Sequence, residues 1–352
     1  MSETTRTITI FTPSHADADS TNAQNLTVKE IVARLPPERF RVAMFSSPDP
    51  DPRIATRPNT VLIPARVHGN TARFLARLLL ARPNIFFYPR YGPLDQIFFS
   101  LRSRLHLNIA VVTHVVMIMN EATAPGASRY IREANAVLAN SNYVAETVRR
   151  MFGVEAGTIH NGIDRRFFFP REQEPSEPAA PVVLYAGSFQ ARKRVELIIH
   201  QAARHPQVHF RLAGRGETEP ACRNLAERLG CHNVEFLGHL TPAQLGAQMR
   251  NSDLFLFPSI LEGHPQVLGQ ASACGLPSIA MNLYRPDYVL NGESGFLVES
   301  DDELAEKLEV LLRDSALRRS MSRAAVAHAV NFDWDRIVLQ WQEVFETAAA
   351  KR

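Results

Sequence analysis

Cysteine is scarce in this chain, and long apolar runs are missing. Among 352 residues there are only three cysteines, Cys222, Cys231 and Cys274, an odd number without the paired spacing of a zinc site or a disulfide framework. We therefore expect them to be small residues of the core. The most apolar stretch, residues 109–119, is shorter than a membrane span and contains His114.

The start of the chain lacks the features of a secretory signal. Residues 1–20 carry acidic and hydroxyl side chains and run directly into a predicted strand. We therefore expect a cytoplasmic protein. Hydrophobic residues make up 45% and charged residues 21% of the chain, a balance typical of soluble globular proteins and not of disordered or fibrous ones.

No pair of aspartates with the character of a metal site follows a predicted strand. Asp17 and Asp19 have the spacing of such a pair, but no strand end of the usual kind precedes them. We interpret them as loop residues and expect neither a metal ion nor another cofactor. The charge is uneven, with 20 Lys plus Arg against 13 Asp plus Glu through residue 167 and 19 against 23 beyond it. The net charge of +3 gives no indication of a nucleic-acid partner.

Strand and helix patterns alternate along the chain, which is typical of doubly wound parallel sheets. In the first half, strands are predicted near residues 7–12, 41–45, 60–63, 85–88, 109–113, 136–139 and 158–160. Helices are predicted near residues 27–35, 71–82, 94–104 and 144–152, the first of them opened by a capping box of Thr27 and Glu30.

The segment at 170–181, PREQEPSEPAAP, is too rich in Pro and Glu to pack in a core, and we interpret it as an interdomain linker. A second strand and helix series follows it, beginning with VVLYAGSF. The predicted domains are residues 1–167, with a returning helix at 334–352, and residues 168–333. We expect two Rossmann-like domains that face each other across a cleft.

The stretch from Pro258 to Pro277, PSILEGHPQVLGQASACGLP, carries the clearest functional signal. An apolar strand ends before it, a polar loop follows, and Pro265 stands where the first turn of a helix tolerates a missing N–H. Such a helix start offers unpaired N–H groups to a phosphate. Glu262, at the mouth of the loop, can accept hydrogen bonds from sugar hydroxyls. Ordinary α/β structure is the alternative interpretation.

This stretch resembles the signature of family 4 retaining glycosyltransferases, which have the GT-B fold. The family pattern is a Glu, seven residues and a second Glu before an ACGxP context. The residues that match are Glu262, Gly263, Pro265, Ala273, Cys274, Gly275 and Pro277. The resemblance implies that Glu262 contacts the donor sugar, and that Gln270, in place of the second Glu, meets the ribose. It implies a donor-binding segment composed of Gly263, His264, Pro265, Gln266 and Val267, with His264 where Phe is usual.

The resemblance extends over nearly the whole chain and is strongest from Asn140 onward. The segments NSNYVAETVRRMFGV, IHNGID, FLGHL, DLFLFPS and NGESGFLV match further landmarks of the family. Residues 334–349 resemble the closing helix that crosses back to the first domain. The chain departs from the family in the loop after the first strand, PSHADADSTNAQN, which has no glycine.

A basic cluster, Arg192, Lys193 and Arg194, follows a predicted strand end at Gly187. Cations there can neutralise a diphosphate leaving group, although such a cluster can equally be a solvated helix start. The resemblance assigns the phosphate-side lysine to Lys193, whereas Ser188 replaces the family arginine. Arg192 and Arg194 are candidates to substitute for it.

The remaining candidates lie at other predicted strand ends. His114 matches the family histidine that faces the donor sugar from the first domain, but a histidine of the core is the alternative. Gly214 matches the glycine of a loop near the nucleotide, and Arg215 beside it can meet the base or remain exposed. We therefore predict catalytic roles for Glu262, His114 and Lys193, and donor binding by Ser188, Arg192, Arg194, Gly214, Arg215 and the 263–270 segment.

The resemblance implies a metal-independent, retaining hexosyltransferase that moves a sugar from a UDP- or GDP-linked donor to an unknown acceptor hydroxyl, lipid-linked or on a polysaccharide precursor. Two alternatives stay open: a catalytically weak sugar-nucleotide binding subunit and a nucleotide-sugar epimerase on the same fold. Residues 66–104 contain seven arginines and one acid, Asp95. This composition predicts either a solvated helix face or peripheral contact with an anionic surface on the inner face of the membrane.

Overall fold

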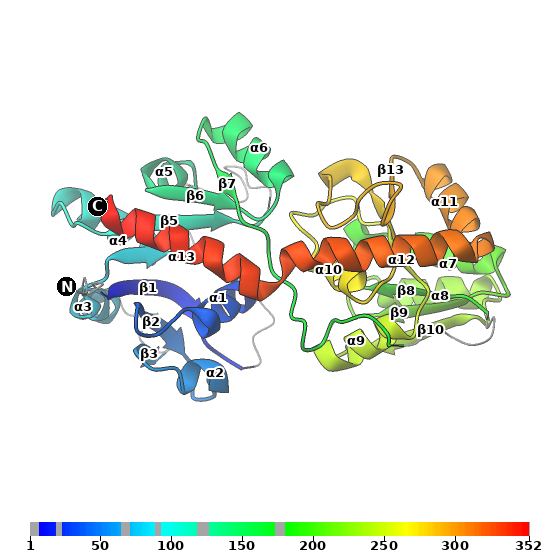
Figure 1. Cartoon of the computed structure of the whole chain (residues 1–352), viewed down its shortest axis with the longest axis horizontal. Coiled ribbons are helices and arrows are strands. Elements are labelled where there is room, and N and C mark those ends of the chain that lie inside the picture. Colours follow the sequence, from blue (N-terminus) through cyan, green and yellow to red (C-terminus); the bar gives the residue numbers. More distant parts are fainter. Residues whose placement is uncertain are drawn as a thin grey trace. The chain divides into compact units, whose positions relative to one another are not determined.

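The computed structural model describes residues 7–18, 23–64, 71–88, 93–117, 127–172 and 180–351. The chain divides into two compact units, residues 1–161 with 334–352 and residues 162–333 (Figure 1). This division falls earlier than the predicted boundary at 167, because the intervening segment is bonded to the second unit. The Ile163 N–H donates to the Phe332 carbonyl at 2.7 Å, and the Phe167 carbonyl accepts from Arg250 at 2.9 Å. The predicted linker at 170–181 falls largely outside the described residues.

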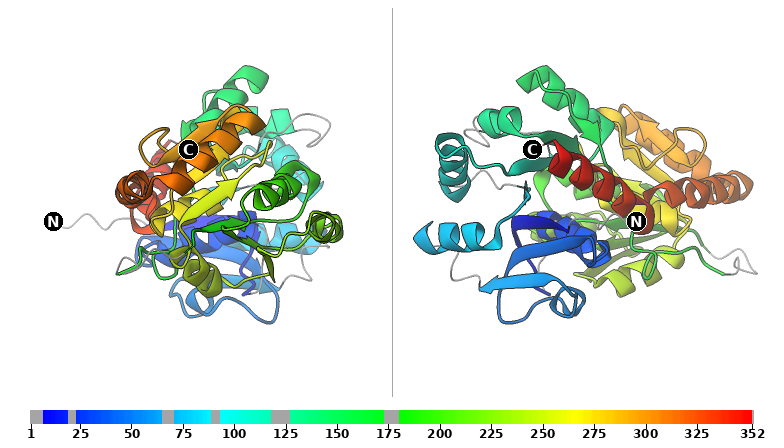
Figure 2. Two further views of the ribbon diagram at one scale, coloured as in Figure 1. Left: turned by 90° about the vertical axis from the view of Figure 1, so that its right-hand side faces the viewer. Right: turned by 60° about the vertical axis from the view of Figure 1, so that its left-hand side comes forward.

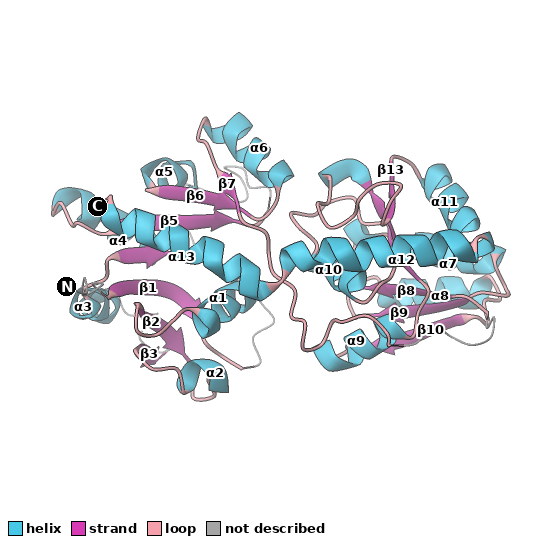
Figure 3. Cartoon of the chain, viewed as in Figure 1, coloured by secondary structure: helices cyan, strands magenta, loops and turns pink. Residues whose placement is uncertain are grey.

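The first unit is built on a parallel sheet of seven strands (Figure 3). Across the sheet the strands are β3 (Thr60–Pro64), β2 (Phe40–Ser46), β1 (Ile8–His15), β4 (Ile85–Phe87), β5 (Ala110–Val115), β6 (Ala136–Ala139) and β7 (Gly157–Thr158). All six residues of β5 are buried, Thr113 and His114 among them, and its other four residues are apolar because helices cover both faces of such a sheet.

The helices of the first unit are α1 (Ala23–Arg34), α2 (Pro52–Ala55), α3 (Thr71–Ala81), α4 (Pro93–Arg104), α5 (Ala127–Glu133), α6 (Asn142–Phe152) and α13 (Trp334–Ala350). The predicted capping box at Thr27 is wrong, because α1 already begins at Ala23. Thr27 lies inside the helix, 2% exposed, and its hydroxyl bonds to the Asn161 side chain at 3.3 Å.

Helix α13 belongs to the first unit although it ends the chain, which confirms the predicted returning helix. It packs against α1 and against strands β1, β4 and β5 (Figure 2). Trp341 and Phe345 are fully buried on it, and both rings make edge contacts with Phe87, at centroid distances of 5.1 and 5.0 Å. Large aromatic area is therefore buried between α13 and strand β4.

The second unit repeats the same design with a parallel sheet of six strands. Their order is β10 (Val234–Gly238), β9 (His209–Ala213), β8 (Val182–Ala186), β11 (Leu254–Phe257), β12 (Ser278–Met281) and β13 (Gly295–Val298). The helices are α7 (Val195–Arg204), α8 (Glu219–Arg228), α9 (Pro242–Arg250), α10 (Gln266–Ala273), α11 (Asp301–Arg313) and α12 (Ser315–Ala329), with short 3₁₀ turns η2 (Ala191–Lys193), η3 (Asn282–Tyr284) and η4 (Val330–Phe332).

The strand order reverses direction between β8 and β11, because the chain first builds one side of the sheet and then the other. Ligands of open α/β sheets bind outside the carboxyl ends of the strands at this switch point. The doubly wound architecture predicted from the sequence is confirmed in both units. Cys222 and Cys274 are buried as expected, but the expectation of a core position is wrong for Cys231, which is half-buried. Within the described ranges, the helices all lack the combination of length and apolar composition that a membrane span requires.

Candidate active site

Two loops of the second unit meet at the switch point of its sheet. One follows β8 and contains η2, and the other follows β11, whose four residues are fully buried. The Ile260 N–H donates to the Arg192 carbonyl at 3.0 Å, and an Arg192 Nη1–H donates to the Leu261 carbonyl at 2.7 Å. These bonds hold the basic cluster and the Glu262 loop side by side.

The Glu262 carboxylate is the centre of this arrangement. Its Oε1 atom accepts from Lys193 Nζ at 2.5 Å, from Arg192 Nη1 at 2.7 Å and from the Ser259 hydroxyl at 2.5 Å. The side chain is only 10% exposed. Its other oxygen, Oε2, has no partner among the described residues, so one lone-pair face of the carboxylate is left for a ligand.

Lys193 is an unusually buried cation. Its side chain is 9% exposed, and its Nζ lies 4.8 Å from the centroid of the Phe257 ring beneath it. Burial lowers the pKa of Lys193, and the neighbouring Glu262 charge opposes that shift. The ammonium is thus held at the strand ends by an anion on one side and an aromatic face on another.

The two arginines of the basic cluster, Arg192 and Arg194, have different surroundings. Arg194 adopts a left-handed conformation (φ 49°) and uses Nε for the Pro258 carbonyl at 2.9 Å and Nη1 for Asp301 at 2.7 Å. It therefore ties the loop after β11 to the start of α11. Arg192 is 38% exposed and, besides Glu262 and Leu261, contacts the Gln190 side chain.

The loops after β8 and β9 approach each other closely through glycine. Gly214 has φ +133°, and a Cβ on it would lie 1.8 Å from the Gly187 carbonyl oxygen. A side chain at Gly214 would therefore separate the two loops. Ser188 beside them is half-buried, and Arg215 is exposed.

Helix α10 begins directly after the Glu262 loop, as predicted. Pro265 is its N-cap residue and supplies no side-chain hydrogen bond to the first turn, which starts with the half-buried Gln266 and Val267. An anion is favoured at such a helix start. One turn further along, the Gln270 side chain is half-buried and has no hydrogen-bond partner in the part of the chain that the structure describes.

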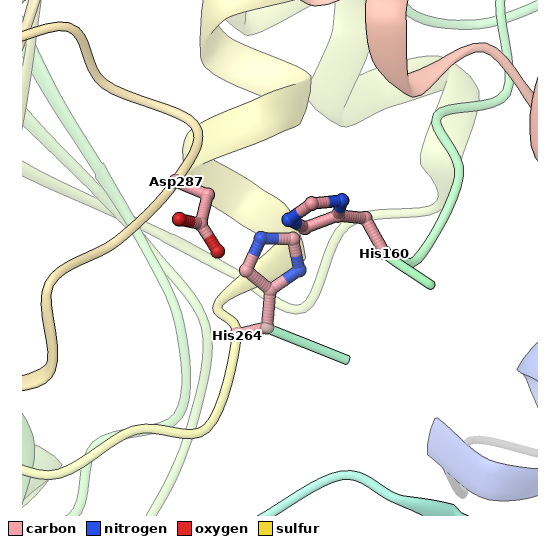
Figure 4. Close-up of side chains that lie close together, drawn as sticks. All are labelled: His160, His264 and Asp287. Atoms are coloured by element: carbon pink, nitrogen blue, oxygen red, sulfur yellow. The ribbon is translucent and has the colours of Figure 1, made fainter. Parts of the chain in front are cut away.

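His264 lies in an aromatic cluster. Its ring is 5% exposed and stacks on Tyr288 with centroids 3.9 Å apart, and Tyr288 in turn meets Phe332 edge-on at 4.7 Å. Figure 4 shows His264 beside the Asp287 carboxylate of the same unit. The ring thus occupies the packing position that an aromatic side chain would fill.

His114 lies at the end of β5 in the first unit and is 1% exposed. Its Nε2 bonds to the Ile159 carbonyl at 3.1 Å, and its ring packs edge-on against Trp341 at 5.0 Å. Burial lowers the pKa of His114 to about 4, so the ring is neutral near pH 7. This environment is that of a core histidine, and a catalytic role for His114 rests on the family resemblance alone.

Two further buried residues of the second unit were not identified from the sequence. Ser259, fully buried, donates to the carboxylate, and its place after Pro258 gives no pattern that would single it out. Tyr284 of η3 is buried, and its hydroxyl has no hydrogen-bond partner among the described residues. Burial raises the pKa of Tyr284 well above its ordinary value, and the negative charge of Glu262 raises it further.

Two family descriptions match successive parts of the chain. Residues 24–167 match Glycosyltransferase Family 4, and residues 167–328 match Glycosyl transferases group 1. The chain belongs to the group 1 glycosyltransferases. The two matches meet at residue 167, a few residues inside the second unit. The group 1 match contains Lys193, Glu262 and Gln270.

Curated relatives agree with this family. The D-inositol 3-phosphate glycosyltransferase of Mycobacterium leprae (strain Br4923) is 29% identical over 252 residues, which cover 64% of this chain and 59% of the relative. That of Mycobacterium tuberculosis (strain F11) is 30% identical over 230 residues, 60% of this chain and 48% of the relative. The matched part of this group 1 chain therefore spans about half to three-fifths of the length of these relatives.

Solved structures show the fold. Sucrose-phosphate synthase from Thermosynechococcus elongatus superposes with a TM-score of 0.79 at 20% identity, covering 99% of this chain and 100% of that one. Anabaena HepE in complex with UDP-glucose gives 0.76 at 19% identity, covering 97% and 100%. The predicted GT-B fold class is confirmed for this group 1 glycosyltransferase.

Proposed function

We propose that this chain transfers a sugar from a nucleoside diphosphate sugar to an acceptor hydroxyl, with retention of anomeric configuration. The observation that carries the proposal is the meeting of Lys193, Arg192 and Glu262 at the switch point of the second sheet, where a nitrogen of each cation lies within 2.7 Å of Glu262 Oε1. Cations for a diphosphate and an anion for sugar hydroxyls are thereby present in a single ligand-binding position.

In the proposed reaction each group has a separate task. Lys193 and Arg192 stabilise the negative charge that builds on the departing diphosphate, and the N-terminal turn of α10 favours the same charge. Glu262 binds hydroxyls of the transferred sugar, and Gln270 binds the ribose. Retention without a dedicated nucleophile, which the family resemblance implies, fits a front-face reaction in which the leaving phosphate helps to take the acceptor proton.

The donor is proposed to be a UDP- or GDP-linked hexose. The complexes of Anabaena HepE with UDP and with UDP-glucose support the class of donor, since that protein shares the fold over its full length. We also propose that no metal ion is needed, because Lys193 and Arg192 supply positive charge where a metal would otherwise bind the diphosphate.

A catalytically weak binding subunit is the second candidate function. Gln270 and Ser188 replace charged residues of the family pattern, and His114 is buried at the end of β5. Loss of the family arginine at Ser188 would slow turnover more than it would abolish donor binding, and Gln270 would hold the ribose less strongly than a Glu would. An epimerase on the same fold is a further alternative, which the signature around Glu262 disfavours.

A product analysis separates these functions. The full chain is incubated with a panel of UDP- and GDP-hexoses and a mixed acceptor pool, and the products are identified by mass spectrometry. A new product heavier than its acceptor by one sugar residue supports transfer. Recovery of the donor as its epimer supports the epimerase, and tight donor binding without any product supports the binding subunit.

An acceptor at an anionic membrane surface is proposed from the first unit. On α3, Leu79 and Leu80 are 52% and 73% exposed, and the exposed Arg77 lies on the same helix, while Leu78 is buried. Apolar side chains beside basic ones are typical of interfacial helices. Of the seven arginines in residues 66–104, Arg66, Arg90 and the side chain of Arg73 lie outside the described residues.

A further inference from the structure

The carboxylate at the centre of the site already holds the cations that the proposed function assigns to the donor. All three hydrogen-bonding contacts of Glu262 converge on one oxygen, Oε1, and two of the three donors are full charges, on Lys193 and Arg192. A diphosphate that bound these cations while the carboxylate stayed would bring like charges together in a partly desolvated site.

We propose that Glu262 is a built-in competitor of the diphosphate: donor binding replaces its ion pairs with Lys193 and Arg192 and so releases the carboxylate toward the sugar. This inference rests on the proposed function and adds an exchange step to it. After transfer, the same carboxylate recaptures the cations and helps to expel the nucleoside diphosphate product.

The surroundings of the two cations suit such an exchange. Lys193 is packed over Phe257 with its side chain 9% exposed, so its ammonium stays in place and the phosphate must come to it. Arg192 is 38% exposed and reaches Glu262 from the edge of the site, so its guanidinium can turn outward to a phosphate. Ser259, an uncharged donor, remains bonded to the carboxylate throughout.

A different arrangement would make the opposite prediction. If Lys193 and Arg192 served only to hold Glu262 in position through Oε1, with Oε2 presented to the sugar, removing the negative charge would leave nucleoside diphosphate binding unchanged or weaken it. The exchange predicts tighter binding of a nucleoside diphosphate when the negative charge of Glu262 is removed, whereas the positioning arrangement predicts unchanged or weaker binding.

The test is calorimetric titration of the full chain with UDP and, separately, GDP. Glu262→Gln is nearly isosteric and removes only the charge, so the exchange predicts about tenfold tighter binding of whichever diphosphate the parent binds. The matched control is Glu227→Gln, the same change at an exposed position of α8 in the same unit. It should bind as the parent does. The corresponding nucleoside monophosphate should show a smaller gain, because it carries less charge.

The conditions and the second variant keep the result decisive. The titration is done at pH 7. Burial lowers the pKa of Lys193 and the charge of Glu262 opposes this shift, so in Glu262→Gln the pKa of Lys193 falls further and the lysine would lose its proton at a higher pH. If Glu262→Gln does not fold, Glu262→Ala, checked by its melting curve, removes the same charge. A parent that binds UDP or GDP and a Gln variant that binds it no tighter would overturn the exchange alone. Failure of the parent to bind either diphosphate would overturn the proposed function as well.

Discussion

Glu262 and Gln270 belong to the same signature, one in the loop before α10 and the other on that helix, yet their removal should affect different kinetic constants. Glu262 is assigned to the reacting sugar and Gln270 to the ribose, a remote group of the donor. An interaction that strengthens in the transition state changes kcat, whereas one that is equal in ground and transition states changes KM. The perturbations are Glu262→Ala and Gln270→Ala.

The magnitudes follow from the two environments. Glu262 is 10% exposed, and a charged hydrogen bond that its Oε2 accepts from a sugar hydroxyl is desolvated, so its loss should cost about 3 kcal/mol and lower kcat by about a hundredfold. Gln270 is half-buried and neutral, so its hydrogen bond should contribute about 1 kcal/mol, and KM for the donor should rise by less than tenfold. Restoring the family residue with Gln270→Glu should keep activity or tighten the donor.

Steady-state kinetics over a range of donor concentrations measures both constants. Melting curves are needed beside them, because Glu262→Ala leaves the buried Lys193 without its anion, and breaking a buried ion pair is destabilising. The reasoning is refuted if folded Glu262→Ala turns over donor as fast as the parent. It is equally refuted if Gln270→Ala lowers kcat as much as Glu262→Ala does.

Three further predictions concern metal, pH and location. Lys193→Ala should lower kcat/KM by about a hundredfold, while EDTA has little effect and the half-buried Lys307→Ala control on α11 behaves as the parent; loss of activity in EDTA with recovery in Mn²⁺ would contradict this. Burial lowers the pKa of His114 to about 4 from 6.5, so between these two pH values the unfolded chain binds a proton that the folded chain does not. The free energy of unfolding should therefore fall by about 2 kcal/mol from pH 7 to pH 5. In urea titrations His114→Gln should flatten this dependence and the exposed His106→Asn should not, and equal slopes in all three proteins would refute the assignment. The chain should float with anionic vesicles at moderate salt, and Leu79→Ser with Leu80→Ser should weaken this whereas Leu339→Ser should not; equal partition into neutral and anionic vesicles would remove the support.

The fold was predictable because its periodic patterns are long and consistent. Strand β11 reads as a continuous apolar run, and the helix predicted near residues 71–82 is observed as α3, Thr71–Ala81. Two short helices, α2 with four residues and α5 with seven, were missed, because so few residues do not display a helical period. The start of α1 was misplaced because Thr27, which has the character of a cap, uses its hydroxyl inside the helix to reach Asn161.

The candidate site was predictable in its residue types but not in its pairing. The signature placed Glu262 before a helix start and Lys193 after a strand end, and the switch point brings the two together. Spacing along the chain could not show that Arg194 is engaged by Pro258 and Asp301, or that Ser259 completes the contacts of Glu262. These depend on which side chains fill the space between loops, and that is decided by packing across strands far apart in sequence.

One measurement tests most directly whether the chain transfers a sugar from donor to acceptor at the site around Glu262. A donor from the panel that carries a ¹³C-labelled hexose is incubated with the acceptor pool and either the parent chain or folded Glu262→Ala, and labelled products are quantified by mass spectrometry. Transfer predicts a labelled acceptor product from the parent and about a hundredfold less of it from the variant at saturating donor. A parent that binds the donor but leaves all the label in unreacted donor or free hexose would contradict the account.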